Sequence, residues 1–462
     1  MRCRAPQSMY GHGVTSPSDL APDGPSAEDP RAEDLGVKDS GAKDSLPESG
    51  RSVFGPLRRP RLRRIVSAQF LAELGDGVSL VALPLYVWAR TGSEVWTSLT
   101  FAAELGLGVV FAVLGGVLAD GFDRQRVLLI SYLVRCTLLV LAFAVDPLLL
   151  AVAFGVSARA LGMADNPSFD ALIPGHAEGD LQQVVALRRM IQAVSITIGP
   201  AIGALAVWLI GARSALLLNS ATFVIAFALL VGVRNADSDF ATRRAQIGDQ
   251  ISGLSLRQAV QDLFSGMALV AKTPGVRRLL PYTTVVMGTV GVLMAAAVVF
   301  YERDLDAADF WYGLAIAAYG IGSAVGLAMA GSMQLRFPLP RIIVMATPFY
   351  AVACAIGAAV ASPAVLAISW FLWGVLLGPE LVTSETFFLS RVAEQHRGRA
   401  FASLNVANSL GMAIGSLLAA PLLAGYSARM VILGTGVVVL AAGLFWVRPA
   451  IQGDRWPGTV PS

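Results

Sequence analysis

Five charged residues interrupt long apolar stretches of this chain: Glu73, Asp76, Glu104, Arg135 and Arg159. Glu73 and Asp76 fall about eight to eleven residues into the first stretch, or roughly 12 to 17 Å along a helix axis, which is near the middle of a bilayer. Glu104 lies at a similar depth in the second stretch. An ionised carboxylate at that depth is costly, so each acid needs a basic partner, a water-filled cavity or a bound proton.

Two interpretations of this charged set remain open. In the first, one carboxylate binds a proton on one side of the membrane and releases it on the other; we rank Asp76 first for this role, then Glu73, then Glu104. In the second, Glu73, Asp76 and Arg159 form a fixed ion-pair network between helices. Arg135 in the third apolar stretch is a further available partner.

The apolar stretches that hold these residues predict an all-α membrane protein. Of the 462 residues, 55% are hydrophobic and only 15% are charged, which is far less polar than a soluble enzyme of this length. A window of about 19 residues gives about twelve transmembrane helices. Their expected ranges are 65–88, 95–118, 127–145, 148–168, 184–208, 213–233, 279–301, 310–332, 341–361, 363–388, 401–424 and 427–447.

A polar segment divides the spans six and six, so we expect two six-helix bundles. The predicted parts are a disordered cytoplasmic N-terminal tail (1–60), a first bundle (61–234), a cytoplasmic linker with an amphipathic helix (235–278), a second bundle (279–448) and a cytoplasmic C-terminal tail (449–462). Arginines gather before the first span, after the second, at the start of the fifth and in the linker. Because cationic loops stay in the cytoplasm, both termini are expected there.

A short charged hairpin joins the second and third spans, and its pattern resembles the loop after the second helix of major facilitator superfamily transporters, G-x-L-a-D-r-x-G-r-k-x-x-l. Gly121 and Asp123 depart from that pattern in a way similar to the bacterial branch of enterobactin and macrolide exporters. The matching residues are Gly116, Leu118, Asp120, Arg124 and Leu128. The Glu-Leu-Gly-Asp-Gly run at 73–77 looks like the same branch.

The resemblance implies a cytoplasmic gate. In the family, the hairpin acid meets the start of the eleventh helix and the basic residues meet acids near the fourth helix, locking the halves together. Carried over, Asp120 faces the backbone near Phe401, and Arg124 and Arg126 supply the basic groups. The alternative is an ordinary solvated turn.

A second set of gate residues is predicted in the second half. Glu380 and Glu385 come toward the end of the tenth span, and Arg397 and Arg399 follow in a stretch that resembles the family's R-G-R loop. The two acids either pair with these arginines as a second latch or lie hydrated at the helix end.

The fifth span carries Gly199, Pro200 and Gly203, similar to the antiporter motif that marks efflux members of the family. Proline removes a backbone donor and glycine permits close approach, so a bend is expected there, although both residues are frequent in membrane helices without such a role. A related run, from Gly411 to Ser416 in the eleventh span, suggests an internal repeat.

Together these features predict a secondary active transporter, not an enzyme, that exports a small organic molecule such as a drug, siderophore or secondary metabolite by proton-coupled alternating access. An uptake symporter on the same fold and a non-transporting membrane sensor or scaffold are the alternatives. The expected partners are protons, the substrate and the lipid bilayer, with no nucleic acid, cofactor or metal. The expected form is a monomer in the bacterial plasma (inner) membrane.

Overall fold

The protein folds into a bundle of membrane-length helices. The computed structural model describes residues 55–173, 181–233, 256–273, 276–307, 309–336, 339–393 and 396–453. Twelve helices in these ranges are long and apolar enough to cross a membrane. The fold class predicted from hydropathy, an all-α membrane protein with about twelve spans, is therefore confirmed. The N-terminal tail up to residue 54, the linker residues 234–255 and the last residues from 454 lie outside the described ranges.

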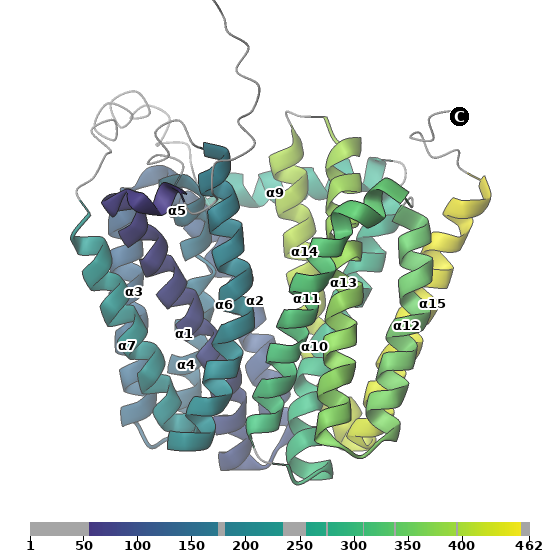
Figure 1. Ribbon diagram of the computed structural model, residues 1–462, viewed down its shortest axis with the longest axis horizontal. Helices are drawn as coiled ribbons and strands as arrows, with labels where there is room; N and C mark the ends of the chain where they lie inside the picture. Colours follow the sequence, from purple (N-terminus) through teal and green to yellow (C-terminus); the bar gives the residue numbers. More distant parts are fainter. Residues whose placement is uncertain are drawn as a thin grey trace, which may run out of the picture. The chain divides into compact units, whose positions relative to one another are not determined.

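The two halves of the chain form separate groups of helices. Figure 1 shows the first half, purple to teal, on one side and the second half, green to yellow, on the other. After a short turn η1 (Gly55–Arg58), the first half comprises α1 (Pro60–Thr91), α2 (Glu94–Gly121), α3 (Arg124–Ala144), α4 (Leu148–Gly162), α5 (Asp165–Leu172), α6 (Leu181–Ile210) and α7 (Ala212–Val231).

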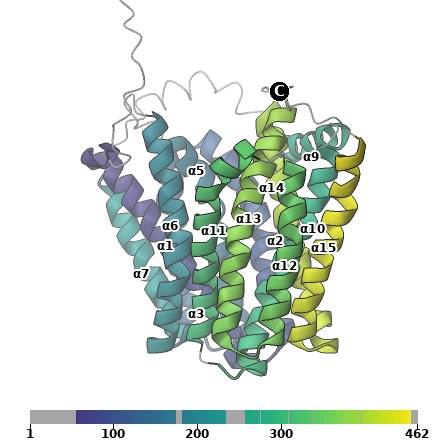
Figure 2. The ribbon, with the colours of Figure 1, turned by 45° about the vertical axis from the view of Figure 1, so that its right-hand side comes forward.

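The second half follows the same plan. It comprises α9 (Leu256–Lys272), α10 (Val276–Val299), the π-helical turn η4 (Phe300–Asp304), α11 (Phe310–Arg336), α12 (Leu339–Ala359), α13 (Pro363–Arg391), α14 (Arg397–Gly425) and α15 (Ala428–Gly453). The turned view of Figure 2 shows α9 lying across one end of the second-half helices. This helix lies in the segment for which an amphipathic linker helix is expected.

The fourth predicted span is not one continuous helix. Sequence hydropathy predicts a helix over 148–168, whereas the structure ends α4 at Gly162 and begins α5 at Asp165. Pro167 has no N–H and cannot donate to the carbonyl one turn earlier, so the regular helix is interrupted there. The break turns Asp165 toward the interior, where it is buried.

Glycine contacts repeat between the two halves. A Cβ atom on Gly199 of α6 would lie 2.9 Å from the Cα atom of Gly77 in α1. In the second half, a Cβ on Gly415 of α14 would meet the backbone of Gly288 in α10. The glycines that form the sequence repeat thus make equivalent close helix contacts, because only residues without a large side chain let backbones approach this closely.

The halves also touch each other at the end of the bundle where α2 begins. The Arg303 guanidinium of η4 lies 3.6 Å from the Glu94 carboxylate of α2. Gly313 of α11 lies against Ala204 of α6, where a Cβ would meet the alanine side chain. These contacts join α2 and α6 of the first half to η4 and α11 of the second half.

The glycine contact between α1 and α6 predicts a selective loss of stability. We expect Gly199→Ala to lower the free energy of unfolding by about 1–3 kcal/mol, because the new methyl group meets backbone atoms that cannot move alone. Gly106→Ala in α2 is the matched control, since a Cβ there has no neighbour within 4 Å. Thermal unfolding of both purified variants measures the difference, and equal midpoints would contradict this account of the packing.

Candidate functional site

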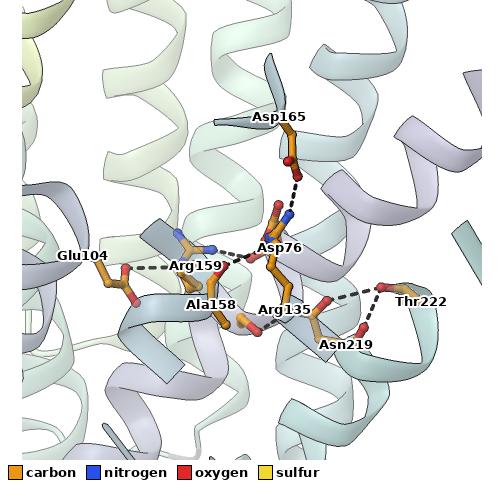
Figure 3. A network of polar contacts seen from close by, with 9 residues as sticks. Asp76, Glu104, Arg135, Ala158, Arg159, Asp165, Asn219 and Thr222 are labelled. Atoms are coloured by element: carbon orange, nitrogen blue, oxygen red, sulfur yellow. Dashed lines mark hydrogen bonds and ion pairs between the residues drawn. The ribbon is translucent and has the colours of Figure 1, made fainter. Parts of the chain in front are cut away.

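Arg135 is the centre of a buried charged network in the first half (Figure 3). Its side chain is only 1% exposed. One terminal nitrogen donates to the Asp165 carboxylate at 2.8 Å, the other contacts the Asp76 carboxylate, and Nε donates to the Ala158 carbonyl at 2.9 Å. The guanidinium carbon also lies 4.1 Å from the centre of the Phe223 ring. Arg135 therefore ties α3 to α1, α4, α5 and α7.

Arg159 forms the second branch of the network. Its Nε lies 3.1 Å from a carboxylate oxygen of Glu104 in α2, and one terminal nitrogen donates to the backbone carbonyl of Asp76 at 2.5 Å. Figure 3 shows Glu104, Arg159 and Asp76 following one another toward Arg135. Four of the five charged residues that open the sequence argument thus lie in one connected group.

Glu73 lies beside this network without joining it. The Gln69 amide donates to one carboxylate oxygen of Glu73 at 2.8 Å, and the other oxygen is buried without a hydrogen-bond partner among the described residues. Arg188 of α6 is close enough to attract Glu73 electrostatically, but it is ion-paired with Asp170. Within the described ranges, Glu73 is the one acid of this region that forms no ion pair.

A cavity of about 220 Å³ opens onto these groups. Glu73, Asp76 and Asp165 line it together with both arginines, and apolar side chains complete the wall: Ala72, Leu80, Met163 and Phe169. A water molecule takes about 30 Å³ of liquid volume, so the space accommodates a small group of waters or part of an organic molecule. Water or cargo can therefore reach acids that sit inside a membrane-length bundle.

Helix α7 holds α1 in place behind the network. Asn219 donates to the hydroxyl of Ser79 at 2.6 Å, and Thr222 donates to Asn219 at 3.2 Å. A Cβ on Gly75 would meet both Asn219 and Thr222, so glycine at this position lets the polar side chains reach the α1 backbone. This support orients the α1 face that carries Glu73 and Asp76.

The gate predicted at the hairpin is only partly described. Asp123 accepts hydrogen bonds from the backbone N–H groups of Gln125 at 2.9 Å and Arg126 at 3.2 Å, so it caps the start of α3. The Arg126 side chain lies 3.8 Å from Asp123 and is exposed. Gly116 and Arg124 lie on α2 and α3, but the side chain of Asp120 is outside the described part, so its contact near Phe401 remains a prediction.

The described residues of the second predicted latch have separate partners. Glu380 is 3% exposed and accepts a hydrogen bond from the Tyr350 hydroxyl at 2.8 Å, so it lies inside the second half and not at a hydrated helix end. Glu385 is half-buried and close enough to Arg189 of α6 to attract it. Arg397 donates to the Val392 carbonyl at 3.4 Å. The Arg399 side chain is outside the described part.

The antiporter-like motif lies directly behind the cavity. Pro200 lines it, while Gly199 and Gly203 face the α1 backbone at Gly77 and Val78. A shift of α6 at this motif would therefore move the cavity wall.

Sequence reasoning missed Asp165 and the Arg188–Asp170 pair. Asp165 falls within the expected fourth span, so the same rule that singled out Glu104, an acid among apolar residues, would have found it. Arg188 was counted only among the arginines at the start of the fifth span, which indicate orientation in the membrane.

Comparison with known proteins identifies the family of this chain. The family model of the Major Facilitator Superfamily matches residues 65–277 and 279–459. The multidrug efflux pump Tap of Mycobacterium tuberculosis is 25% identical over 412 residues, covering 84% of this chain and 93% of that protein. The MFS-type transporter YfiS of Bacillus subtilis is 22% identical over 376 residues, covering 78% of this chain and 86% of that protein.

Solved structures show the same fold. The nucleoside transporter NupG aligns with a TM-score of 0.69 and 12% identity, covering 85% of this chain and 99% of that chain. A bacterial homologue of the lysosomal transporter Spinster, in an inward-facing state, aligns with a TM-score of 0.65 and 13% identity over 85% of this chain and 98% of that chain. With its family model matched across both halves and its twelve membrane-length helices, the chain belongs to the Major Facilitator Superfamily of multi-pass membrane transporters.

Proposed function

We propose that this protein is a proton-coupled exporter of small organic molecules. The observation that carries the proposal is the composition of the cavity in the first half. Four acids, Glu73, Asp76, Glu104 and Asp165, lie in or beside its network against two arginines, Arg135 and Arg159, while the neighbouring Arg188 is paired with Asp170. Two negative charges are therefore in excess when all groups are ionised.

Such an excess is costly in a membrane-length bundle and is removed by protons or by a cationic cargo. A buried charge without a partner costs several kcal/mol, whereas a neutral carboxyl costs much less. Binding of protons and binding of a cation are thus alternatives at the same cavity. That exclusion is what an antiporter needs, because it prevents both ligands from crossing together.

Glu73 is the preferred proton carrier. The sequence ranked Asp76 first, but Asp76 is engaged by Arg135, and Glu104 is engaged by Arg159. Among the described residues, Glu73 accepts a hydrogen bond from the Gln69 amide, has the Ser195 hydroxyl nearby and forms no ion pair, and it faces the cavity. Protonating Glu73 also relieves its repulsion with Asp76, one turn away on the same helix face.

The cycle follows from these assignments. Facing outward, Glu73 takes a proton, and the cavity, now with one negative charge fewer, closes without cargo. Facing inward, the proton leaves through the water-filled cavity, and the restored negative charge attracts the cargo. The apolar wall formed by Leu80, Met163 and Phe169 suits the organic part of that cargo, which is neutral or cationic.

The direction of transport and the location of the protein rest on similarity and on charge. Tap, which covers most of this chain, is a multidrug efflux pump, and this supports efflux of drug-like molecules. The arginines around the described helices support a bacterial plasma-membrane protein with both termini in the cytoplasm. The chain is proposed to work as a monomer, since the network lies within the first half of a single chain.

The first test replaces Glu73 by its amide. We expect Glu73→Gln to lower export driven by an imposed pH gradient at least about tenfold, which corresponds to about 1.4 kcal/mol of lost coupling. Exchange of labelled for unlabelled substrate across proteoliposomes, without a gradient, should persist because it needs no change of protonation. Both rates are measured with the purified chain and a panel of cationic drugs and dyes.

Asp146→Asn is the matched control for this test. Asp146 is an exposed acid whose ion pair with Arg213 lies outside the cavity, so its loss should leave both rates unchanged. Gradient-driven export that stays at the wild-type level in Glu73→Gln, Asp76→Asn and Glu104→Gln alike would overturn the proton assignment. Uptake of label driven by inward protons would instead identify a symporter.

The second test measures how much the ion pairs of Arg135 stabilise the fold, independently of any proton transfer by Glu73. Arg135→Gln leaves the buried Asp165 carboxylate and the partly exposed Asp76 carboxylate without their cation, and we expect a loss of about 3–5 kcal/mol in stability. Adding Asp165→Asn removes one of those carboxylates and should recover part of the loss. Thermal unfolding of the single and double variants measures this; a double variant no more stable than Arg135→Gln would argue against the ion-pair clamp.

A further inference from the structure

One carboxyl group in the second half has the same place in the fold as Asp165 in the first. The start of α12 follows the start of α3 by the same number of residues as the start of α13 follows the start of α4. Residues of the two halves can therefore be matched one to one across these helices. In that register Arg135 corresponds to Tyr350, and Asp165 corresponds to Glu380. The two donors also reach their acids at the same distance, 2.8 Å.

The partner differs between the halves. In the first half the acid faces a guanidinium, which carries a permanent positive charge. In the second half the equivalent position supplies a phenol, and α10 has no acid or base between Leu279 and Val299. No arginine, lysine or histidine of the described residues forms an ion pair with Glu380. The carboxyl is nevertheless 3% exposed, at membrane depth within α13.

The titratable groups around Glu380 are all uncharged phenols or distant acids. Tyr350 of α12 donates to it, the Tyr282 hydroxyl of α10 lies within reach of it, and Tyr319 of α11 interacts with Tyr350. On α13 itself, Glu385 lies more than one turn away and is directed toward Arg189 of α6. Helix α14 starts with Arg397, which donates to the Val392 carbonyl.

The Tyr282 hydroxyl is a second group that can donate a hydrogen bond to Glu380. It is fully buried and has no hydrogen-bond partner among the described residues, although it lies near Glu380. A neutral carboxyl needs only the single bond from Tyr350. An ionised carboxylate accepts more, and a small rotation of the Tyr282 hydroxyl supplies a second charge-stabilising bond.

We propose that Glu380 is a second proton-binding site, located in the C-terminal helix bundle. A proton from water binds the carboxylate to give a neutral acid bonded to Tyr350. When the proton returns to water, Tyr350 and Tyr282 share the carboxylate. The role of Glu380 in transport rests on the proposed exporter cycle, in which Glu73 already carries a proton. Proton binding at Glu380 does not depend on that cycle.

A proton fits this site better than a larger cation does. The neighbouring cavity in the second half is about 30 Å³, the volume of a water molecule, and its lining does not include Glu380. The Tyr350 and Trp373 rings pack against each other at a tilt, with centres 4.9 Å apart, on the α12 side of the site. An organic cation would have to displace these rings, whereas a proton needs only water.

The direct test is infrared spectroscopy of the purified full chain, exchanged between buffers of two pH values. A protonated carboxyl has its own carbonyl-stretch band, so the wild-type difference spectrum should contain a band that Glu380→Gln lacks. Glu385→Gln, the same change on the same helix, should keep the band, and Tyr350→Phe should shift it. A Glu380→Gln spectrum identical to wild type would overturn the proposal. Gel filtration confirms that each variant is folded.

A transport readout connects the site to the cycle. With the membrane potential clamped at zero, each coupled proton multiplies the final substrate gradient by about ten for each unit of imposed pH difference. Glu380→Gln should therefore lower the final gradient about tenfold at a one-unit difference, and an unchanged gradient would remove Glu380 from the cycle. A chain that transports nothing but shows the Glu380 band would refute the exporter and leave this site standing.

Discussion

The structure depends on the cost of holding ionised groups in an apolar bundle. In the first half Arg135 compensates the charge of two acids, and its contacts fix α3 against α1, α4 and α5. A buried ion pair adds little net stability, but breaking one is expensive, so such contacts hold their helices in a single arrangement. Arg135 therefore clamps α3 to its neighbours, and Glu73 lies outside this clamp.

Packing is shared by the two halves, while their charges are not. Small residues bring α1 against α6 and α10 against α14 in equivalent ways. At the equivalent positions of Arg135 and Tyr350, by contrast, one half has a permanent cation and the other a neutral phenol. The glycine contacts define the bundle and tolerate no large change. The polar positions inside it can diverge, because each needs only a partner that compensates its own charge.

Sequence alone was sufficient for the helices and for most of the charged residues. Twelve apolar stretches of membrane length leave few alternatives, and a charge within one of them is conspicuous. The partners were harder to predict, because a helix that is apolar on every face does not reveal its rotation. One interpretation placed Arg159 with Glu73 and Asp76; it pairs with Glu104 and donates to the backbone carbonyl of Asp76. Glu380 was expected either to pair with loop arginines or to lie hydrated at the helix end, but the rotation of α13 turns it toward Tyr350 in the interior.

The contrast between clamped and unpaired acids also bears on the proton coupling that we propose. Two states of a transporter differ by a few kcal/mol, and a ligand shifts them only by its difference in affinity. A proton on an acid already held by arginine changes little, since the arginine stabilises the ionised form in both states. A proton on an acid without a cation changes the charge of the site, and its affinity depends on whether water reaches that acid. Among the described residues, Glu73 in one half and Glu380 in the other form no ion pair, so the protons that we propose would change the charge of the site at these two acids.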